Sequence, residues 1–292
     1  MRAVQIDVHG GPEVLSVREV ADPRPGPGEV LIRTVASSLN PVDWKTRVWD
    51  VGPAFPMTLG WDLAGIVVAS SSAGFAVGDR VIAMSAQVAT GRGTWAELVA
   101  LPEQLVTAAP ATITLPEAAT LPLAGTTALQ ALAKLDLAGR KRLLVTGAAG
   151  AVGGLAVQLA KHAGITVDGL VSRPEHAAVV RDLGAGTVVD HAGDLPKGAY
   201  DAVFDTAGVD VSLAVAEGGR YVSVSDEPLP DVPGATKSYV QESAKDLAEL
   251  VALVDAGELR VRVAEHHPVT EVRVAHERFE AGGLSGKVVL LF

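Results

Sequence analysis

The chain has 292 residues, of which 48% are apolar and 20% charged, and its formal net charge is −10. This length and apolar content predict a folded protein large enough for two domains, while the acidic balance argues against a nucleic-acid partner. The absence of cysteine excludes disulfides, thiolate zinc ligands and a cysteine nucleophile, and the seven histidines follow no metal-ligand pattern, so we expect no metal.

The first third of the chain is predicted to be mostly β. A loop rich in proline and glycine at 22–28 precedes a β-rich run at Glu29–Ala36. Further strands are expected at Ala64–Ala69 and Val81–Met84, with a turn at Gly78–Arg80 between them. Short strands separated by turns are typical of an antiparallel barrel or sandwich.

After Pro116 the pattern changes to alternating helices and strands. Helices are expected at 121–137, 152–163, 174–183 and 244–256, and strands at 142–146, 166–171, 187–190, 202–205, 221–224 and 287–292. Such alternation indicates βαβ units and a parallel, doubly wound sheet, so the fold class is α/β. The longest uncharged stretch, 118–133, is broken by proline and glycine, and residues 1–8 alternate in polarity. We therefore expect no membrane span, no secretion signal and a cytoplasmic protein.

The segment Val145–Gly153 contains a glycine-rich turn between a predicted strand and a predicted helix. Glycine permits a tight turn and close approach of a pyrophosphate, and the helix N-terminus offers free N–H groups to that anion. The strand–turn–helix context makes a dinucleotide site the favoured interpretation, and a glycine-rich turn without a ligand is the alternative. The expected cofactor-binding residues here are Gly147, Ala148, Gly150, Ala151 and Val152.

The end of the second strand of this unit indicates which dinucleotide is bound. NAD enzymes place an acid there for the ribose 2′-hydroxyl, but here the strand ends in Ser172 and Arg173. Asp168 lies too early for that role, and Glu175 comes after Pro174. A guanidinium suits a 2′-phosphate, so we predict NADPH, with a solvated loop arginine as the alternative.

Five segments together give the chain a resemblance to a known family. These are Asn40–Lys45, Gly60–Gly65, Gly78–Val81, Ala156–Lys161 after the glycine loop, and Gly286–Leu290. Over essentially the whole chain, the sequence resembles the zinc-free medium-chain dehydrogenases/reductases, in particular quinone oxidoreductases and enone reductases. Trp61 and Asp62 stand where the zinc-dependent members carry histidine and glutamate.

The resemblance implies a GroES-like, mostly antiparallel β catalytic domain with a Rossmann domain inserted in it. The catalytic domain would comprise 1–118 and 259–292, and the NADPH-binding domain 119–258. It also implies a homodimer. The early Asn40–Lys45 segment would be an active-site loop, and it lacks the tyrosine that many relatives use as proton donor.

Several residues acquire expected roles by position in the family pattern. Asn40 and Lys45 would be catalytic, Thr127 would contact the nicotinamide carboxamide, and His191 and Lys287 would complete the cofactor site. All of these except Asn40 have a simpler alternative: Thr127 bonding its own helix backbone, His191 as a surface residue at a strand end, Lys287 as a strand-edge charge, and Lys45 as a solvated loop lysine. Lys45 is the candidate electrophile for the carbonyl oxygen, with Asn40 and a backbone N–H as alternates.

The predicted reaction is hydride transfer from NADPH to the conjugated C=C of an enone, or to a quinone, without zinc. Trp44, Trp49 and Trp61 would form an aromatic substrate wall, although at least one, most readily Trp61, could belong to the core. Two alternatives stay open: a non-catalytic NADPH-binding or interaction protein on the same fold, and a tailoring reductase of a natural-product pathway. The only partner expected beyond a second copy of the chain is the small-molecule substrate.

Overall fold

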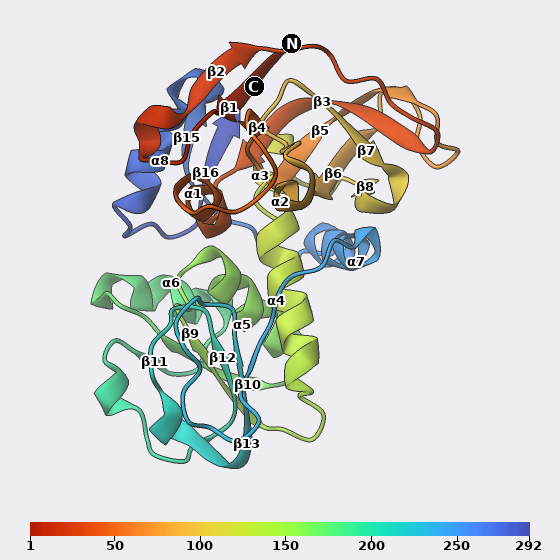
Figure 1. The fold of residues 1–292 in the computed structure, drawn as a ribbon. Helices are drawn as coiled ribbons and strands as arrows, with labels where there is room; N and C mark the ends of the chain where they lie inside the picture. The colour runs from red at the N-terminus through yellow and green to blue at the C-terminus, as the bar shows by residue number, and fades with distance from the viewer. The chain divides into compact units, whose positions relative to one another are not determined.

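A computed structural model describes residues 1–292, which fold into two compact units (Figure 1). Unit 1 comprises 1–123, 242–256 and 261–292, and unit 2 comprises 124–241 and 257–260. These bounds assign residues 242–256 to unit 1, whereas the predicted nucleotide domain, 119–258, contains them. The predicted division into catalytic and cofactor domains stays a prediction about function.

Unit 1 is built on two sheets. The larger has the order β15-β16-β3-β5-β6-β8, with β7 also paired to β3, and the smaller has the order β2-β1-β4. All of these pairs are antiparallel except β15 with β16. The strands are β1 (Arg2–Ile6), β2 (Ser16–Glu19), β3 (Glu29–Ser38), β4 (Met57–Thr58), β5 (Asp62–Ser70), β6 (Arg80–Met84), β7 (Leu98–Pro102), β8 (Val106–Ala108), β15 (Val263–Pro268) and β16 (Lys287–Leu291). The three strands predicted for the first third of the chain are confirmed as parts of β3, β5 and β6.

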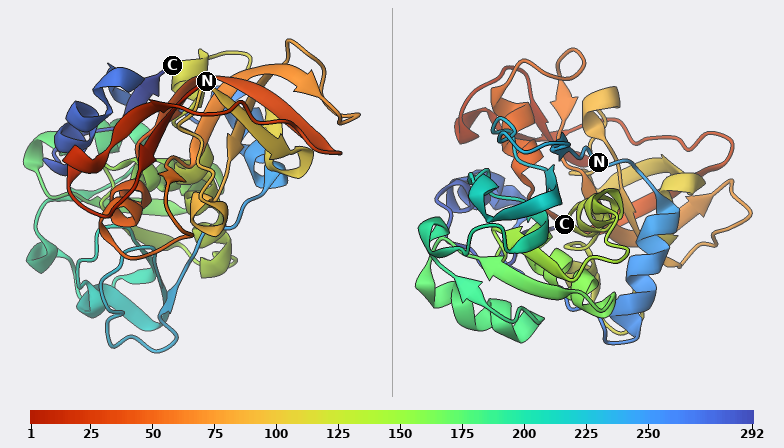
Figure 2. Two further views of the ribbon diagram at one scale, coloured as in Figure 1. Left: turned by 45° about the horizontal axis from the view of Figure 1, so that its top comes forward. Right: turned by 90° about the horizontal axis from the view of Figure 1, so that it is seen from below.

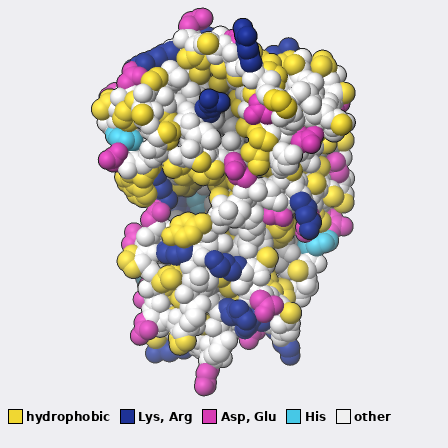
Figure 3. Space-filling model, turned by 45° about the vertical axis from the view of Figure 1, so that its right-hand side comes forward, with side chains coloured by type: hydrophobic (Ala, Val, Ile, Leu, Met, Phe, Trp, Pro, Cys, Tyr) yellow, Lys and Arg dark blue, Asp and Glu magenta, His cyan; other side chains and the backbone are white.

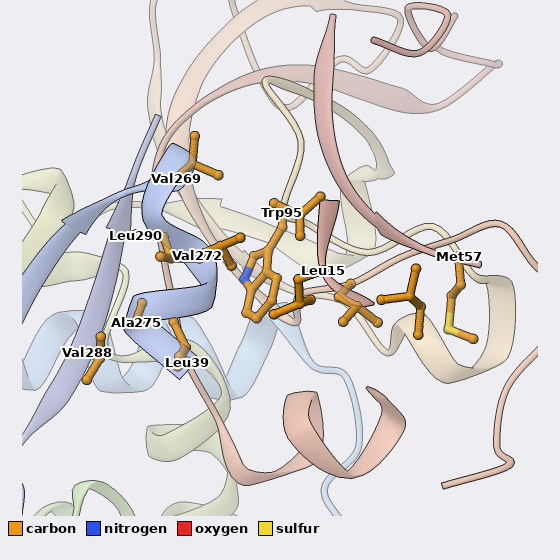
Figure 4. Close-up of a cluster of buried hydrophobic side chains, with 12 residues drawn as sticks. Leu15, Leu39, Met57, Trp95, Val269, Val272, Ala275, Val288 and Leu290 are labelled. Carbon is orange, nitrogen blue, oxygen red and sulfur yellow. The ribbon is translucent and has the colours of Figure 1, made fainter. Parts of the chain in front are cut away.

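A hydrophobic cluster fills the space between the small sheet, β16 and helix α8 (Val272–Glu280) of unit 1. Trp95 is fully buried in it and contacts side chains that come from both ends of the chain, including Leu15 and Val272 (Figure 4). The N-terminal and C-terminal segments therefore share one core, and the two termini lie close together (Figures 1 and 2). Burial of this apolar surface stabilises unit 1 at roughly 25 cal/mol per Å².

Unit 2 is a Rossmann-type parallel sheet. Its strands are β9 (Arg142–Thr146), β10 (Thr166–Leu170), β11 (Val188–Val189), β12 (Tyr200–Asp205), β13 (Val215–Ser223) and β14 (Thr236–Lys237). Their order is β11-β10-β9-β12-β13-β14, and every pair is parallel, which is the dinucleotide-binding 3-2-1-4-5-6 order. Only short 3-10 turns connect β11 to β12 and β12 to β13. The predicted α/β fold with a parallel sheet is confirmed.

The helices agree with the predicted ones at most positions. They are α1 (Pro41–Val48), α2 (Gln87–Thr90), α3 (Leu115–Ala118), α4 (Pro122–Leu135), α5 (Ala151–His162), α6 (Ala177–Leu183), α7 (Ala244–Asp255) and α8. The interpretation of Asn40–Lys45 as a loop is wrong, because Pro41–Lys45 opens α1. Asn40 precedes the helix in an extended conformation, Pro41 occupies its first turn, and the Asn40 N–H donates to the carboxylate of Asp43 (2.7 Å).

No helix of the structure combines the length and the apolar character needed to cross a membrane. On the face drawn in Figure 3, acidic and basic side chains are interspersed among polar and apolar ones. That face therefore presents no continuous basic area of the kind that binds a phosphate backbone.

Candidate active site

The predicted glycine loop of unit 2 has the geometry of a phosphate-binding turn. β9 ends at Thr146, Gly147 has a φ of +60°, and α5 begins at Ala151. A Cβ atom on Gly153 would lie 2.3 Å from the carbonyl oxygen of Gly147. The chain can therefore pass this closely between strand and helix only because Gly147 and Gly153 lack side chains.

The N-terminus of α5 is the anion-binding end of this loop. Gly150 is the N-cap residue in an extended conformation, and Ala151 and Val152 form the first turn of the helix. The N–H groups of a first turn have no acceptor within their helix, and the helix dipole places partial positive charge beside them. Ala148 is fully buried, and its N–H donates to the carbonyl oxygen of Leu170 (3.1 Å), which ties the loop to β10.

At the carboxyl end of β10, Ser172 and Arg173 are exposed. The guanidinium of Arg173 makes no ion pair within the protein, so it can receive an anion from solution.

Asp168, in contrast, is buried and bonded within the unit. Its carboxylate accepts from Arg142 Nη2 (2.6 Å) and Nε (2.9 Å), from the Thr187 N–H (2.9 Å) and from the Tyr200 hydroxyl (3.2 Å). Asp168 is thus unavailable to a ribose, as the sequence indicated.

Two other predicted cofactor residues of unit 2 lie on different elements. His191 is exposed beyond the end of β11, where its Nδ1 accepts from the N–H of Gly193 (3.1 Å). Thr127 lies in α4 and is 8% exposed, and its hydroxyl makes no hydrogen bond to its own helix. That observation removes the simpler alternative for Thr127, while its contact with a nicotinamide stays a prediction.

In unit 1, α1 brings together Trp44, Lys45 and the following Trp49. The two indole rings meet edge to face with centroids 5.9 Å apart. The Lys45 ammonium lies 5.9 Å from the Trp44 centroid and 5.8 Å from that of Trp49, so the two rings share a cation–π contact. Lys45 is half-buried on a helix, which corrects the alternative of a solvated loop lysine.

Trp61 lies apart from this aromatic pair and makes no ring contact with it. Its side chain is buried at the start of β5, and its indole N–H has no hydrogen-bond partner in the protein. The structure therefore brings together two of the three tryptophans expected to line a substrate wall. The role of each of the three stays a prediction.

Asn40 and Lys287 meet in a buried polar group that also contains Asp62 and Ser38. The Asn40 Nδ2 donates to the Asp62 carboxylate (2.8 Å), and the Lys287 ammonium donates to the amide oxygen of Asn40 and to Asp62 (3.3 Å). The Ser38 hydroxyl donates to the same carboxylate oxygen. We call Ser38, Asn40, Asp62 and Lys287 the amide cluster.

The electrostatics of this group follow from its burial. Burial lowers the pKa of Lys287, and the carboxylates of Asp62 and Asp43 oppose that shift. Burial raises the pKa of Asp43 well above its usual range, while the hydrogen bond from the Asn40 backbone and the charge of Lys287 act in the opposite direction. The Lys287 side chain faces the Asp62 carboxyl group (3.3 Å), and Asp43 holds its proton to higher pH than an exposed aspartate.

The sequence predicted a role in the site for Asn40 and Lys287 but none for Asp62 or Ser38. One signal was available for Asp62, because it stands in the otherwise apolar run Trp61–Ala64, and a charge buried in a strand needs a partner. The identity of that partner depends on the fold. No group of three or more His, Asp or Glu side chains lies close enough to hold a metal ion.

Comparison with known proteins places this geometry among dehydrogenases. Residues 26–111 match the family model described as alcohol dehydrogenase GroES-like domain, and residues 178–290 match the one described as zinc-binding dehydrogenase. The chain is 34% identical over 309 residues to the NADPH-dependent alkenal/one oxidoreductase, chloroplastic, of Arabidopsis thaliana, which covers 99% of this chain and 79% of that protein.

Two further similarities cover nearly the full length of both proteins. The quinone oxidoreductase of Pseudomonas aeruginosa is 32% identical, with 99% of each chain covered. A solved mycobacterial protein complexed with NADPH superposes with a TM-score of 0.85 at 28% identity, with 100% of each chain covered.

Proposed function

Because the chain belongs to the medium-chain dehydrogenase/reductase family, among the quinone oxidoreductases and alkenal reductases, we propose that it is an NADPH-dependent oxidoreductase acting on small molecules. Its substrate is an α,β-unsaturated carbonyl compound or a quinone, reduced without zinc. The observation that carries this proposal is the pairing of the Gly147–Gly153 turn with Arg173, an unpaired cation at the end of the neighbouring strand.

The residues of unit 2 fit NADPH in chemical character. The first turn of α5 would receive the pyrophosphate, with Gly147, Ala148 and Gly150 shaping the approach. Ser172 and Arg173 would bind the 2′-phosphate through charge-assisted hydrogen bonds. His191 and Thr127 complete the proposed set, the first beside the adenosine half and the second beside the carboxamide. When bound, NADPH supplies the hydride that is added to the β-carbon.

The residues of unit 1 supply the electrophile in this proposal. As the β-carbon is reduced, negative charge develops on the substrate's carbonyl oxygen, and an ammonium is a suitable partner for that charge. Lys45 is the proposed group, and its ammonium lies beside the indoles of Trp44 and Trp49. Those rings, with Trp61, would contact the apolar part of the substrate. The proton for the α-carbon would come from water or from Lys45.

The direct test is NADPH consumption, compared with NADH, against a panel of enones and quinones with identification of the products. A saturated ketone from an enone, with NADPH preferred, is the expected result. Tight NADPH binding without turnover of any panel member would instead favour a non-catalytic binding protein, or a tailoring reductase that accepts only a larger natural product.

Lys45→Ala tests the electrophile. We expect the turnover number to fall about 100-fold or more, as when an oxyanion donor is removed, with little change in NADPH affinity. Lys134→Ala, in the C-terminal part of α4, is a control that removes a lysine outside the proposed site. An unchanged turnover number in Lys45→Ala would remove this residue from the mechanism.

Assembly and location are also parts of the proposal. We infer a homodimer on the family resemblance, and we keep the cytoplasm as the proposed location. Analytical ultracentrifugation gives the assembly state directly, and a mass of one chain at micromolar concentration would contradict the dimer. Location varies within the family, since the Arabidopsis relative is named as chloroplastic.

A further inference from the structure

The bonding of the Asn40 side chain limits what it can do for a substrate. Both N–H bonds of its amide are used, one toward Asp62 (2.8 Å) and the other toward the carbonyl oxygen of Ser38 (3.4 Å). Its amide oxygen accepts from the Lys287 ammonium, and the whole residue is only 2% exposed. The amide thus has no donor left for a carbonyl oxygen, but its orientation is fixed at both ends.

Asp62 is itself held in place from several directions. Its backbone carbonyl accepts from the hydroxyls of Ser37 and Thr94, both at 2.6 Å. Its second carboxylate oxygen accepts from the N–H of Leu123 (2.7 Å). Because these partners lie in different segments of unit 1, the carboxylate cannot move without breaking several buried hydrogen bonds.

Lys287 approaches from the third side. It is the first residue of β16, which pairs antiparallel with β3 so that Val289 faces Ser38. Its ammonium therefore lies beside the end of β3 at Ser38, which is two residues before Asn40 in the chain. The amide cluster joins the end of β3 and the starts of β5 and β16 to Asn40, the N-cap residue of α1.

We propose that Asp62 and Lys287 are positioning residues, which hold the Asn40 side chain. The backbone of Asn40 is bonded to Asp43 in the first turn of α1, so a fixed Asn40 also fixes the start of the helix that carries Trp44 and Lys45. The part of this inference that concerns catalysis rests on the role proposed above for Lys45. Buried ion pairs are often no more stabilising than apolar residues of the same volume. The charges of Asp62 and Lys287 therefore serve to select one arrangement of the amide.

The decisive variant removes both charges together. In Asp62→Asn/Lys287→Met no uncompensated charge stays buried, so this protein is expected to fold where Lys287→Met alone can fail. Both oxygens of the Asp62 carboxylate accept hydrogen bonds, one from the Leu123 N–H and the other from the Asn40 NH₂. In an amide at position 62 the NH₂ replaces one of these acceptors, so in either orientation one N–H donor faces another. Replacement of Lys287 also removes the ammonium that donates to the amide oxygen of Asn40, so the Asn40 amide loses its fixed orientation.

Three measurements read out the effect. The turnover number, measured at saturating NADPH and corrected for the fraction of chains that bind it, is expected to fall about 10-fold or more, and NADPH affinity reports separately on any contact of Lys287 with the cofactor. Hydrogen exchange of residues 41–48 is expected to accelerate, while that of β9 and β12 stays as in the unaltered protein. Lys197→Met, an exposed lysine of unit 2, is the matched control and should change none of these values.

Two results would overturn the inference. One is a folded double variant with unchanged exchange in α1 and turnover within about 2-fold of the original. The other is a loss of turnover that is matched by an equal loss of NADPH-binding sites and by faster exchange throughout unit 1, which would make the cluster a support of the whole fold. If the unaltered protein turns over no substrate, the proposed function fails, and the exchange of residues 41–48 still decides whether the pair fixes α1.

Discussion

The glycine loop of unit 2 and the amide cluster of unit 1 achieve their geometry in opposite ways. The loop lies within nine consecutive residues, Val145–Gly153, and sterics between near neighbours fix its shape. The amide cluster joins Asn40 to Lys287 across 247 positions of the chain, and nothing in either neighbourhood requires the contact. Local sterics can be deduced from a sequence, whereas a contact of this kind exists only once β16 has paired with β3.

The largest effect is expected from breaking the local motif. In Gly153→Val, the new side chain would meet the carbonyl oxygen of Gly147, where even a Cβ comes within 2.3 Å. Because the obstacle is backbone, the turn must open and α5 must shift. NADPH affinity is expected to fall about 100-fold or more, which a fluorescence titration would measure.

Gly186→Ala is the matched control in the same unit. A Cβ there approaches other atoms no closer than 3.7 Å, and the φ of this glycine is not positive. This variant should bind NADPH as the original protein does. Equal binding by Gly153→Val would show that the turn tolerates a side chain and would refute the steric argument.

These two regions also show what the sequence could predict. The glycine spacing predicted the strand–turn–helix correctly, because each requirement lies within one turn of backbone. The start of α1 was predictable but missed, since Asn40, Pro41 and Asp43 match the N-cap, first and third positions of a helix. Resemblance to the family outweighed that local signal. The bonding of Asp62 was not predictable, because its partners come from segments that only the fold brings together.

The next prediction, on Asp168, separates the stability of unit 2 from its preference between NADPH and NADH. Asp168 is buried and bonded to Arg142, Thr187 and Tyr200. Asp168→Ala leaves their donors without an acceptor, so the free energy of unfolding should fall by about 2 kcal/mol. The ratio of NADPH to NADH affinity should stay unchanged, because this carboxylate faces the interior of the unit. Denaturant unfolding measures the free energy, and titrations with NADPH and with NADH measure the affinity ratio. A changed ratio would place Asp168 at the ribose.

Arg173→Ala should give the complementary result. The guanidinium is exposed and makes no ion pair within the protein, so the free energy of unfolding should stay constant. Loss of its bonds to a 2′-phosphate should reduce NADPH affinity about 10- to 100-fold and leave NADH affinity as it was. Arg181→Ala, exposed on α6, is the control. Equal losses for both cofactors would show that Arg173 does not discriminate between them.

The last effect, which appears only at acidic pH, concerns a second polar group that only the fold assembles, beside the core of unit 1. His276 is fully buried, neither of its ring nitrogens makes a hydrogen bond, and its ring lies edge to face with that of Trp95. Burial, assisted by the charge of Arg47, lowers the pKa of His276 to about 3, while Glu280 lies 3.6 Å from its Nδ1. The histidine is therefore neutral in the folded state at neutral pH.

The sign of the pH effect follows from the difference between the two states. Below the ordinary histidine pKa of about 6.5, His276 is protonated in the unfolded chain. In the folded protein it stays neutral until about pH 3. The free energy of unfolding should therefore decrease as the pH is lowered from about 6.5 to about 3, by at most about 1.4 kcal/mol per pH unit. His276→Phe, which can keep the contact with Trp95, should lack this component. Asp43 titrates with the opposite sign, so the difference between the two proteins, measured by denaturant unfolding at each pH, isolates His276. Parallel curves for His276→Phe and the original would mean that His276 binds its proton equally in the folded and unfolded states.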